Sequence, residues 1–353
     1  MRIVSVVGAR PQFVKLGPIA RECRRHPDIE HVIVHTGQHY DEAMSAAFFD
    51  DLDIPAPDVY LGVGSGSHGA QTGAMLSALD PVLAAQQPRW TLVYGDTNST
   101  LAATLAAVKR HLPVAHLEAG LRSHNRRMPE EHNRVLTDHA ADLLLAPTDV
   151  AMAHLAEEGL AARSVLVGDV MTDVCYHVRD VVSGRAVAPA LTGPVPYVVA
   201  TIHRPDNTDD PDRLASIVAA LRDLPVRCRL LVHPRLEARA AAFGIELFGG
   251  RLDSGPPLSY PDMVAAVVGA AGVVTDSGGL QKEAYLLGTP CTTIRTETEW
   301  TETLQDGWNV LDPGLERLPE LVARPAPQAP RGQPYGDGRA AGRVIEQLRR
   351  AGG

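Results

Sequence analysis

The chain has 353 residues, 45% hydrophobic and 21% charged, a composition typical of a folded protein long enough for two domains of ordinary size. A formal net charge of -9 argues against a general nucleic-acid-binding protein. No apolar run approaches the roughly 20 residues that a membrane helix needs, and the N-terminus lacks the layout of a signal peptide. The four cysteines lie far apart without a CxxC motif, which fits a reducing compartment, so we expect a cytoplasmic protein without membrane partners.

The first half of the chain alternates short β-branched runs with amphipathic stretches. The predicted strands are 2–8, 31–37, 91–96, 113–118, 142–147 and 164–168. Helical periodicity fills most of the intervals, as at 101–110 and 134–141. Continuous apolar strands that alternate with helices predict a parallel sheet covered on both faces.

The same pattern stops at 183–196, a stretch rich in proline, glycine and alanine that we interpret as a linker, and then restarts. The later predicted strands are 197–202, 229–233, 245–248, 272–276 and 292–295, and a final helix is predicted at 339–350. The sequence thus predicts two doubly wound α/β units in series. In such sheets ligands bind beyond the carboxyl ends of the strands, so the residues that follow each strand are the informative ones.

Two turns are candidate phosphate sites. After the first strand, Gly8 is followed by Arg10 and Lys15 in the opening turns of a helix, where cations and the helix dipole favour an anion. The turn has neither the GxGxxG nor the P-loop pattern, so NAD and ATP are not indicated, and an ordinary turn with solvated cations explains it equally well.

The second candidate turn comprises Ser277, Gly278 and Gly279, which open a helix after the strand at 272–276. Small residues let backbone amides approach a pyrophosphate, and Glu283 lies one turn further, where a ribose needs a hydrogen-bond acceptor. The alternative is a common loop followed by a surface glutamate, and the position of the acid favours the ligand.

Two His-Arg groups also follow strands of the second unit. They are His203 with Arg204, and His233 with Arg235. Such pairs can neutralise a phosphate and donate a proton to it. A single histidine at a strand end is more often structural, but the repetition favours function.

Several acidic residues mark the same edge of the first unit. Asp96 and Glu118 directly follow apolar strands, whereas Glu130 and Glu131 open a helix that carries Arg134 one turn later. Singly, Asp96 is explained as a helix cap and the glutamates as partners of the helix dipole. Together, beside phosphate-binding turns, they suit acid–base chemistry on a sugar, because burial raises a carboxylate pKa towards neutrality.

The sequence contains no arrangement of residues that indicates a metal or a nucleophilic serine. There is no HExxH motif, and His124, His132 and His139 are too loosely spaced for a zinc site. A GxSxG motif is also missing. We therefore predict an enzyme without metal or cofactor.

Eight motifs in series are similar to those of the non-hydrolysing UDP-N-acetylglucosamine 2-epimerase family. They are GARPQFVKLGP, TGQHYDEAM, VYGDTNST, HLEAGLRS, MPEEHNRVLTDHAADLLLAPT, TIHRPDN, VHPR and TDSGGLQKEAYLLGTPC. The resemblance is colinear over nearly the whole length and implies a GT-B fold, two Rossmann-like domains, usually in a homodimer. It implies an N-terminal catalytic domain of residues 1–182, joined by the helix at 339–353, and a UDP-binding domain of residues 197–338.

The resemblance also implies roles for individual residues. The implied catalytic residues are Asp96, Glu118, Glu130 and His203. The implied or candidate substrate-binding residues are Arg10, Lys15, Arg134, Arg204, His233, Arg235, Ser277, Gly278, Gly279 and Glu283. Some members of the family bind a second UDP-N-acetylglucosamine as an activator through the glutamine and histidine of the TGQH motif, here Gln38 and His39.

The implied reaction is an elimination followed by a re-addition. A carboxylate removes the proton from C2 of the sugar as UDP leaves C1, and the 2-acetamidoglucal is then reprotonated on the opposite face and attacked by UDP. A GT-B glycosyltransferase, a hydrolysing epimerase and a catalytically inactive UDP-sugar sensor are the alternatives. The three acids disfavour a transferase, which normally needs one base.

Three segments depart from the common bacterial pattern of the family. The SHNRRMP loop after Glu118 is two residues shorter, and with the GSGSHGAQTG segment at 64–73 it resembles an archaeal-type subgroup. In TETEWTET, Trp300 replaces an arginine of the common form. This segment resembles members that act on oxidised or 3-amino-substituted UDP-sugars.

Overall fold

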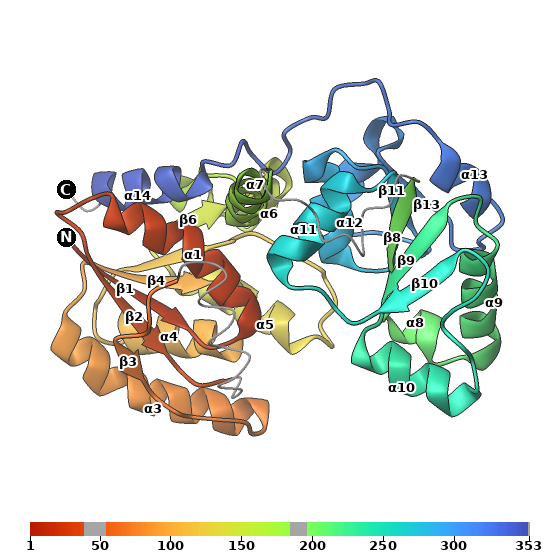
Figure 1. The fold of residues 1–353 in the computed structure, drawn as a ribbon. Coiled ribbons are helices and arrows are strands. Elements are labelled where there is room, and N and C mark those ends of the chain that lie inside the picture. The colour runs from red at the N-terminus through yellow and green to blue at the C-terminus, as the bar shows by residue number, and fades with distance from the viewer. Residues whose placement is uncertain (39–53, 184–195, 352–353) are drawn as a thin grey trace. The chain divides into compact units, whose positions relative to one another are not determined.

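The computed structural model describes residues 1–38, 54–183 and 196–351 (Figure 1). Contacts between residues divide the chain into one unit of Met1–Val174 with Gln333–Gly353 and a second unit of Cys175–Gly332. The boundary falls within a helix, α7 (Val170–Val182), whereas the sequence places it at the linker. Most of that predicted linker lies outside the described residues.

The first unit contains a sheet of seven parallel strands. In spatial order they are β3 (Val59–Tyr60), β2 (Glu30–His35), β1 (Arg2–Val7), β4 (Trp90–Tyr94), β5 (Val114–Leu117), β6 (Leu143–Ala146) and β7 (Ser164–Leu166). Ile3 on β1 pairs with His31 on one side and Trp90 on the other. The order reverses between β1 and β4, so their carboxyl ends define the point where a doubly wound sheet binds its ligand.

Helices cover both faces of this sheet (Figure 1). They are α1 (Arg10–Arg24), α3 (His68–Gln86), α4 (Asn98–Val108), α5 (Pro129–Ala140), α6 (Asp149–Glu157), the short η1 (Ala161–Arg163), α7 and α14 (Ala340–Arg350). On one face, α3 and α4 bury Met75, Leu79 and Ala103 against Val4 and Val6 of β1. On the other face lie α1 and α14.

The C-terminal helix α14 is tied to this first unit by specific hydrogen bonds. The carboxylate of Asp173 accepts bonds from the first amides of the helix, those of Ala340 and Ala341, at 2.9 and 2.8 Å. Near its other end, Leu348 O accepts a bond of 2.9 Å from the indole of Trp90. These contacts give a structural reason why the end of the chain returns to the first unit.

The second unit contains six parallel strands. In spatial order they are β10 (Leu252–Gly255), β9 (Arg227–Leu231), β8 (Tyr197–Thr201), β11 (Gly272–Thr275), β12 (Cys291–Thr293) and β13 (Asn309–Leu311). The helices are α8 (Pro205–Thr208), α9 (Pro211–Arg222), α10 (Pro234–Phe243), α11 (Tyr260–Gly269), α12 (Gly278–Leu287), the short η2 (Thr301–Gly307) and α13 (Leu318–Ala323). The strand order reverses between β8 and β11, which places the second ligand edge there.

Alternating residues of β8 show how both faces of this sheet are buried. Val198 and Ala200 pack with the helices α9, α10 and α13, whereas Val199 packs with Ala266 of α11 (Figure 1). A strand that is apolar on both sides is expected in a parallel sheet between two helical layers. The predicted α/β class with two doubly wound sheets is confirmed.

One strand prediction was wrong. Residues 245–248 form no strand, and the edge strand is β10, seven residues later. Its sequence, LDSG, has no apolar run that would predict a strand. Its polar residue Asp253 instead forms ion pairs of 2.8 Å with Arg227 and Arg229 on neighbouring β9. The short strands β3 and β13 were also not predicted.

Two other features of the composition can be compared with the fold. All four cysteines are buried and free. In the part of the chain that the structure describes, no helix has the length and apolar character needed to cross a membrane.

Candidate active site

The buried side chain of Gln12 joins the two turns at the ligand edge of the first sheet. Its Oε1 accepts bonds from the amides of Gly8 and Ala9 at 2.8 and 3.0 Å, and its Nε2 donates to Tyr94 O at 2.9 Å. Two amides of the predicted phosphate turn are therefore already bonded within the protein. What this turn offers an anion is the exposed Arg10 at the first position of α1.

Lys15 and Glu118 form an ion pair beside Gly95, the residue that follows β4. The pair is largely buried, with side chains 12% and 16% exposed. A Cβ at Gly95 would lie 3.0 Å from Glu118 Oε2 and 3.2 Å from Lys15 Nζ, so glycine leaves room for the pair. Burial alone lowers the pKa of Lys15, but Glu118, with smaller contributions from Asp96 and Asp169, raises it above its ordinary value, so the ammonium is charged.

The backbone of Glu118 is strained. Its φ of 71° lies in the left-handed region, which costs a non-glycine residue about 1 kcal/mol or more. The amides of Glu118 and Ala119 both donate to Leu145 O of the neighbouring strand, at 3.1 and 3.2 Å. This geometry turns the chain sharply where β5 ends, and strain of this kind is concentrated at functional sites.

Asp96 is held by Arg134, one turn into α5. Arg134 Nε donates to Asp96 Oδ2 at 3.0 Å, and a second guanidinium nitrogen contacts the same oxygen. Asp96 does not cap α4, because Thr97 is the N-cap residue and accepts the amide of Thr100. Its carboxylate, 30% exposed, is therefore available at the ligand edge.

The two adjacent glutamates of α5 differ in role. Glu131 accepts bonds from Ser123 N, Ser123 Oγ and His124 N at 3.0, 2.9 and 2.8 Å, and pairs with Arg134 at 2.8 Å. Burial alone raises the pKa of Glu131, but these bonds outweigh it and lower the pKa. Glu130 has no hydrogen bond or ion pair of its side chain within the described ranges, so it is the acid left to act on a ligand.

A buried charge network lies beneath these carboxylates, and the sequence did not reveal it. His116 Nδ1 lies 2.7 Å from Asp138 Oδ1, and its Nε2 lies 2.7 Å from Gly95 O. Both ring nitrogens of His116 thus lie within hydrogen-bonding distance of oxygen acceptors. Arg122 contacts the other oxygen of Asp138 at 2.7 Å. Burial alone raises the pKa of Asp138, but His116 and Arg122 outweigh it and lower the pKa.

His116 therefore holds the carbonyl of the residue that precedes Asp96. Its only sequence signal was a polar residue inside an apolar strand, in the motif HLEAGLRS. Periodicity does not show which distant acid it meets.

Gln38, proposed as part of an activator site, has a structural partner. Its Oε1 accepts bonds from Ser99 N and Ser99 Oγ, at 3.0 and 2.7 Å, near the N-terminus of α4. His39 lies outside the described residues. The activator prediction stays untested.

In the second unit, Asp276 organises the turn that carries His203. It follows β11, is fully buried, and accepts the amides of His203 and Arg204 at 3.1 and 2.9 Å. His203 Nδ1 lies 3.2 Å from the same carboxylate, which leaves Nε2 as the outer nitrogen of a ring whose side chain is 36% exposed. Burial alone raises the pKa of Asp276, but His203, Arg204 and Asn207 lower it. The sequence showed Asp276 in the TDSGG motif without assigning it this role.

The other His-Arg group has largely structural contacts. His233 caps α10 by accepting the amide of Arg235 at 3.1 Å, and its ring centre lies 5.4 Å from that of His203. Burial, with help from His203, lowers the pKa of His233, so the ring is neutral. Arg235 forms an ion pair of 2.6 Å with Asp209.

The candidate phosphate turn of the second unit opens α12, and the start of this helix lies where the sequence predicted it. Ser277 is the N-cap residue and accepts the amide of Leu280 at 3.4 Å. The first amides of a helix lack partners within it, so those of Gly278 and Gly279 are suited to an anion. Burial raises the pKa of Glu283, one turn further, to about 7.

A carboxylate and two arginines lie against this turn. A Cβ at Gly278 would lie 2.1 Å from Glu299 Oε1. The carboxylate of Glu299 pairs with Arg295 at 2.8 Å and with Arg204 at 3.6 Å. The adjacent Trp300 receives the ammonium of Lys282 over its ring, 4.1 Å from the centroid. These residues form one wall of the predicted diphosphate site.

Among the residues that the structure describes, no cluster of three or more histidine, cysteine or acidic side chains could hold a metal ion. The two units thus carry complementary chemistry. The first has cation-paired carboxylates near the point where its strand order reverses, and the second has a helix N-terminus with a His-Asp pair. Such a division of polar groups is typical of α/β enzymes that bind phosphorylated ligands.

The chain belongs to the UDP-N-acetylglucosamine 2-epimerase family, whose model matches residues 21–349. It is 43% identical to a UDP-2,3-diacetamido-2,3-dideoxy-D-glucuronate 2-epimerase of Pseudomonas aeruginosa, over 99% of both chains. It is 36% identical to a UDP-N-acetylglucosamine 2-epimerase of Methanocaldococcus jannaschii, over 99% of both. A solved structure of the UDP-GlcNAc 2-epimerase from that organism superposes with a TM-score of 0.89 at 34% identity, covering 99% of this chain and 100% of that one. These likenesses confirm the predicted family, the GT-B-like fold and the prediction that the chain is an isomerase.

Proposed function

We propose that this chain interconverts a UDP-2-acetamido sugar and its C2 epimer, with UDP-N-acetylglucosamine or a 2,3-diacetamido uronate derivative as the substrate. The observation that carries this proposal is that two carboxylates at the ends of neighbouring strands of the first sheet, Glu118 and Asp96, are each paired with a cation, Lys15 and Arg134. Family membership supplies the reaction class.

The reaction begins with loss of the C2 proton to a carboxylate while the C1–O bond to UDP breaks. The bonding electrons leave with the diphosphate, and C1 and C2 become a double bond. The candidate acids and bases are Asp96, Glu118 and Glu130. A carboxylate held next to the C2 proton lowers the entropic cost of proton transfer. A second acid then delivers a proton to the opposite face while UDP attacks C1, which gives the epimer. The first carboxylate is now protonated and the second acid is ionised, and exchange of these protons with solvent restores the enzyme.

The second unit stabilises the departing UDP. The amides of Gly278 and Gly279 and the outer nitrogen of His203 provide donors for the growing negative charge. Asp276 orients His203 through the contact with its Nδ1. Glu283 accepts the ribose hydroxyls, and Arg10, His233 and Arg235 supply further positive or polar surface.

A modified sugar is favoured by a specific segment. Residues 296–303 read TETEWTET, with Trp300 where the common form of the family has arginine, and the relative at 43% identity is named for a 2,3-diacetamido uronate. The relative at 36% identity is named for the plain sugar. Both substrates therefore enter the test.

The test is incubation with each UDP-sugar in deuterated water, followed by proton NMR. A true substrate acquires deuterium at C2 and a manno-type epimer, with no free sugar released. Exchange should be lost in Asp96→Asn, Glu118→Gln and Glu130→Gln with UDP binding retained, and kept in the exposed control Glu157→Gln. Absence of C2 exchange with both sugars would contradict the proposal.

The same experiment separates the alternatives. A hydrolysing epimerase releases free sugar and UDP, a glycosyltransferase leaves C2 protonated, and a sensor binds UDP-sugar without turnover. On the family resemblance we further propose a homodimer in the cytoplasm. Sedimentation at several concentrations tests the dimer.

A further inference from the structure

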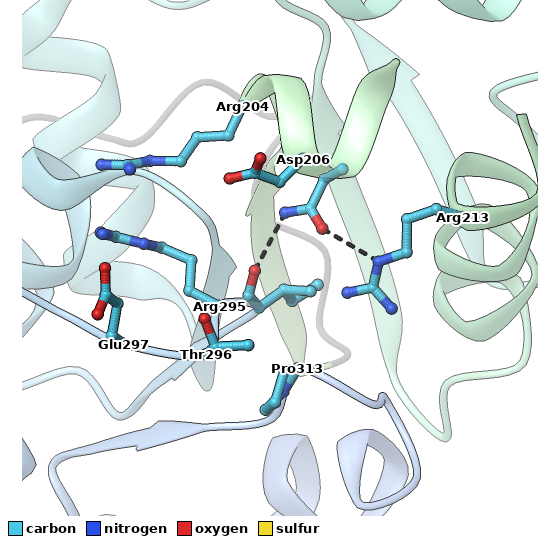
Figure 2. A pocket seen from close by; sticks show the side chains of 9 residues that line it. Arg204, Asp206, Arg213, Arg295, Thr296, Glu297 and Pro313 are labelled. Atoms are coloured by element: carbon cyan, nitrogen blue, oxygen red, sulfur yellow. Dashed lines mark hydrogen bonds between the residues drawn. The ribbon is translucent and has the colours of Figure 1, made fainter. Parts of the chain in front are cut away.

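The second unit holds a cavity that lies beside the predicted diphosphate site and shares Arg204 and Arg295 with its wall. Its volume is about 340 Å³, at the lower end of the range of roughly 300–1,000 Å³ for small-molecule sites (Figure 2). It lies between the β8–α8 turn, helix α9 and the segments after β12 and β13. The residues of the phosphate turn, 277–279, do not line it.

Arginine dominates the chemistry of this cavity. Arg204, Arg213 and Arg295 line it, each from a different element, and all three are partly buried. Its two acids, Asp206 and Glu297, are exposed at the rim. In Figure 2, Arg204 and Arg295 extend in one direction while Arg213 enters from the other side. Arg204 and Arg295 both pair with Glu299, so Arg213 is the arginine of the cavity that is left to attract an anion.

Arg213 is the arginine whose bonding capacity is least used. Its Nε donates to Asn207 Oδ1 at 3.1 Å, but its two terminal nitrogens make no hydrogen bond or ion pair in the described part of the chain. Asp312 acts on it electrostatically without pairing with it. By contrast, Arg235 on α10 donates from Nε to Thr208 and from a terminal nitrogen to both carboxylate oxygens of Asp209. Two free donors in a fixed fork are the arrangement that binds carboxylate or phosphate in bidentate fashion.

Asn207 connects this cavity to the histidine of the proposed site. Its amide oxygen accepts from Arg213, and its Nδ2 donates to Asp276 Oδ2 at 3.1 Å (Figure 2 shows the bond to Arg213). Asp276 in turn holds His203. A ligand that repositions Arg213 therefore acts on His203 through two intervening side chains.

We propose that this cavity is a second oxyanion site, in which the guanidinium of Arg213 binds a phosphate or carboxylate group and Asn207 transmits its occupancy to His203. The anion is either a free small ion or an acidic group on the sugar nucleotide itself; only the second source rests on the proposed function. Residues 277–279 do not line the cavity, whereas Arg204 and Arg295 face both sites, so the test is made with the diphosphate turn occupied by UDP.

The first arm of the test titrates inorganic phosphate into the full-length protein in saturating UDP, which occupies the diphosphate turn, at constant ionic strength set with chloride. Calorimetry should show one saturable site. Loss of a charged hydrogen-bonded pair costs enough for Arg213→Gln to weaken phosphate binding by about tenfold to a hundredfold. Arg213→Lys should restore part of the affinity, and the exposed control Arg251→Gln should leave it unchanged.

The second arm identifies the source of the anion. UDP-glucuronate and UDP-N-acetylglucosamine are compared for binding to the wild type and to Arg213→Gln. If the sugar carries the anion, UDP-glucuronate competes with phosphate and loses at least tenfold in the variant, whereas UDP-N-acetylglucosamine does not. If the ion is free, phosphate and UDP-glucuronate bind without competition, and phosphate alone depends on Arg213.

A third readout tests the connection to His203. Saturating phosphate should shift the acid limb of the turnover pH profile in the wild type and leave it unchanged in Arg213→Gln. The proposal is overturned if Arg213→Gln, folded with a wild-type melting temperature, binds phosphate and UDP-glucuronate as the wild type does. Failure of UDP itself to bind would contradict the proposed function instead, and phosphate titration of the UDP-free protein would still decide the cavity.

Discussion

Glu283 should make nucleotide binding depend on pH in the neutral range. Burial raises the pKa of this carboxyl to about 7, and it lies one turn past the phosphate turn, where a ribose needs an acceptor. An ionised carboxylate accepts hydrogen bonds roughly twice as strong as those of a neutral group. The affinity for UDP should therefore follow the ionised fraction.

The magnitude follows from the pKa. About 9% of the carboxyl is ionised at pH 6 and about 91% at pH 8, so binding that requires the anion weakens about tenfold, or about 1.4 kcal/mol, on going from pH 8 to pH 6. Isothermal titration of UDP at half-unit pH intervals measures this change. Glu283→Gln keeps the shape and the titration of UDP itself but removes that of the carboxyl.

The reasoning is refuted if wild type and Glu283→Gln show the same pH dependence. Stability gives a second check with the opposite sign. The folded pKa is about 7 against an ordinary 4.5, so the folded state holds more protons between these values. The stability of the ligand-free protein should therefore fall as pH rises from about 4.5 to 7, and less steeply in Glu283→Gln.

Three further predictions concern other parts of the site. Asp276→Asn removes the anionic acceptor of His203, so turnover should fall by about 100-fold or more while the affinity for UDP changes less than tenfold. Steady-state kinetics measures turnover and calorimetric titration measures the affinity. Equal losses in both would indicate that the substitution disturbs the fold of the second unit. Glu118→Gly and Glu118→Ala both lose the pair with Lys15. The positive φ at this position is strained for alanine but not for glycine, so the free energy of unfolding in urea should be about 1 kcal/mol higher for the glycine variant. Equal unfolding midpoints would contradict the strain. A 3-acetamido methyl group packed on the Trp300 ring would be worth about fourfold in kcat/KM, so Trp300→Arg should lower the preference for such a sugar over UDP-N-acetylglucosamine by that factor, and an unchanged ratio would show that no such contact forms.

Residues directly after strands were predictable from the sequence. Asp96, Glu118, His203 and Ser277 all follow apolar runs, and because parallel strands end at a common edge, each was placed at the ligand side of its sheet. Helix α12 and the position of Glu283 within it also follow from local pattern, since a helix start depends on a few neighbouring residues.

Local pattern was insufficient where a contact with a distant segment determines the structure. Edge strand β10 is polar because its Asp253 pairs with arginines on β9, so its sequence gave no apolar signal. Likewise, Gln12 and His116 are polar residues whose partners lie far along the chain, at Tyr94 and Asp138. A single sequence shows such a residue but does not show its partner.

The sequence by itself determined the two doubly wound sheets, the family, and the edge at which each candidate residue lies. Only the tertiary structure decided which of them are already engaged. It pairs Glu118 with Lys15 and Asp96 with Arg134, and it leaves Glu130 and the terminal nitrogens of Arg213 without partners in the described chain. The physical reason is that strand order and helix packing set these distances, whereas periodicity reports only which side of an element is buried.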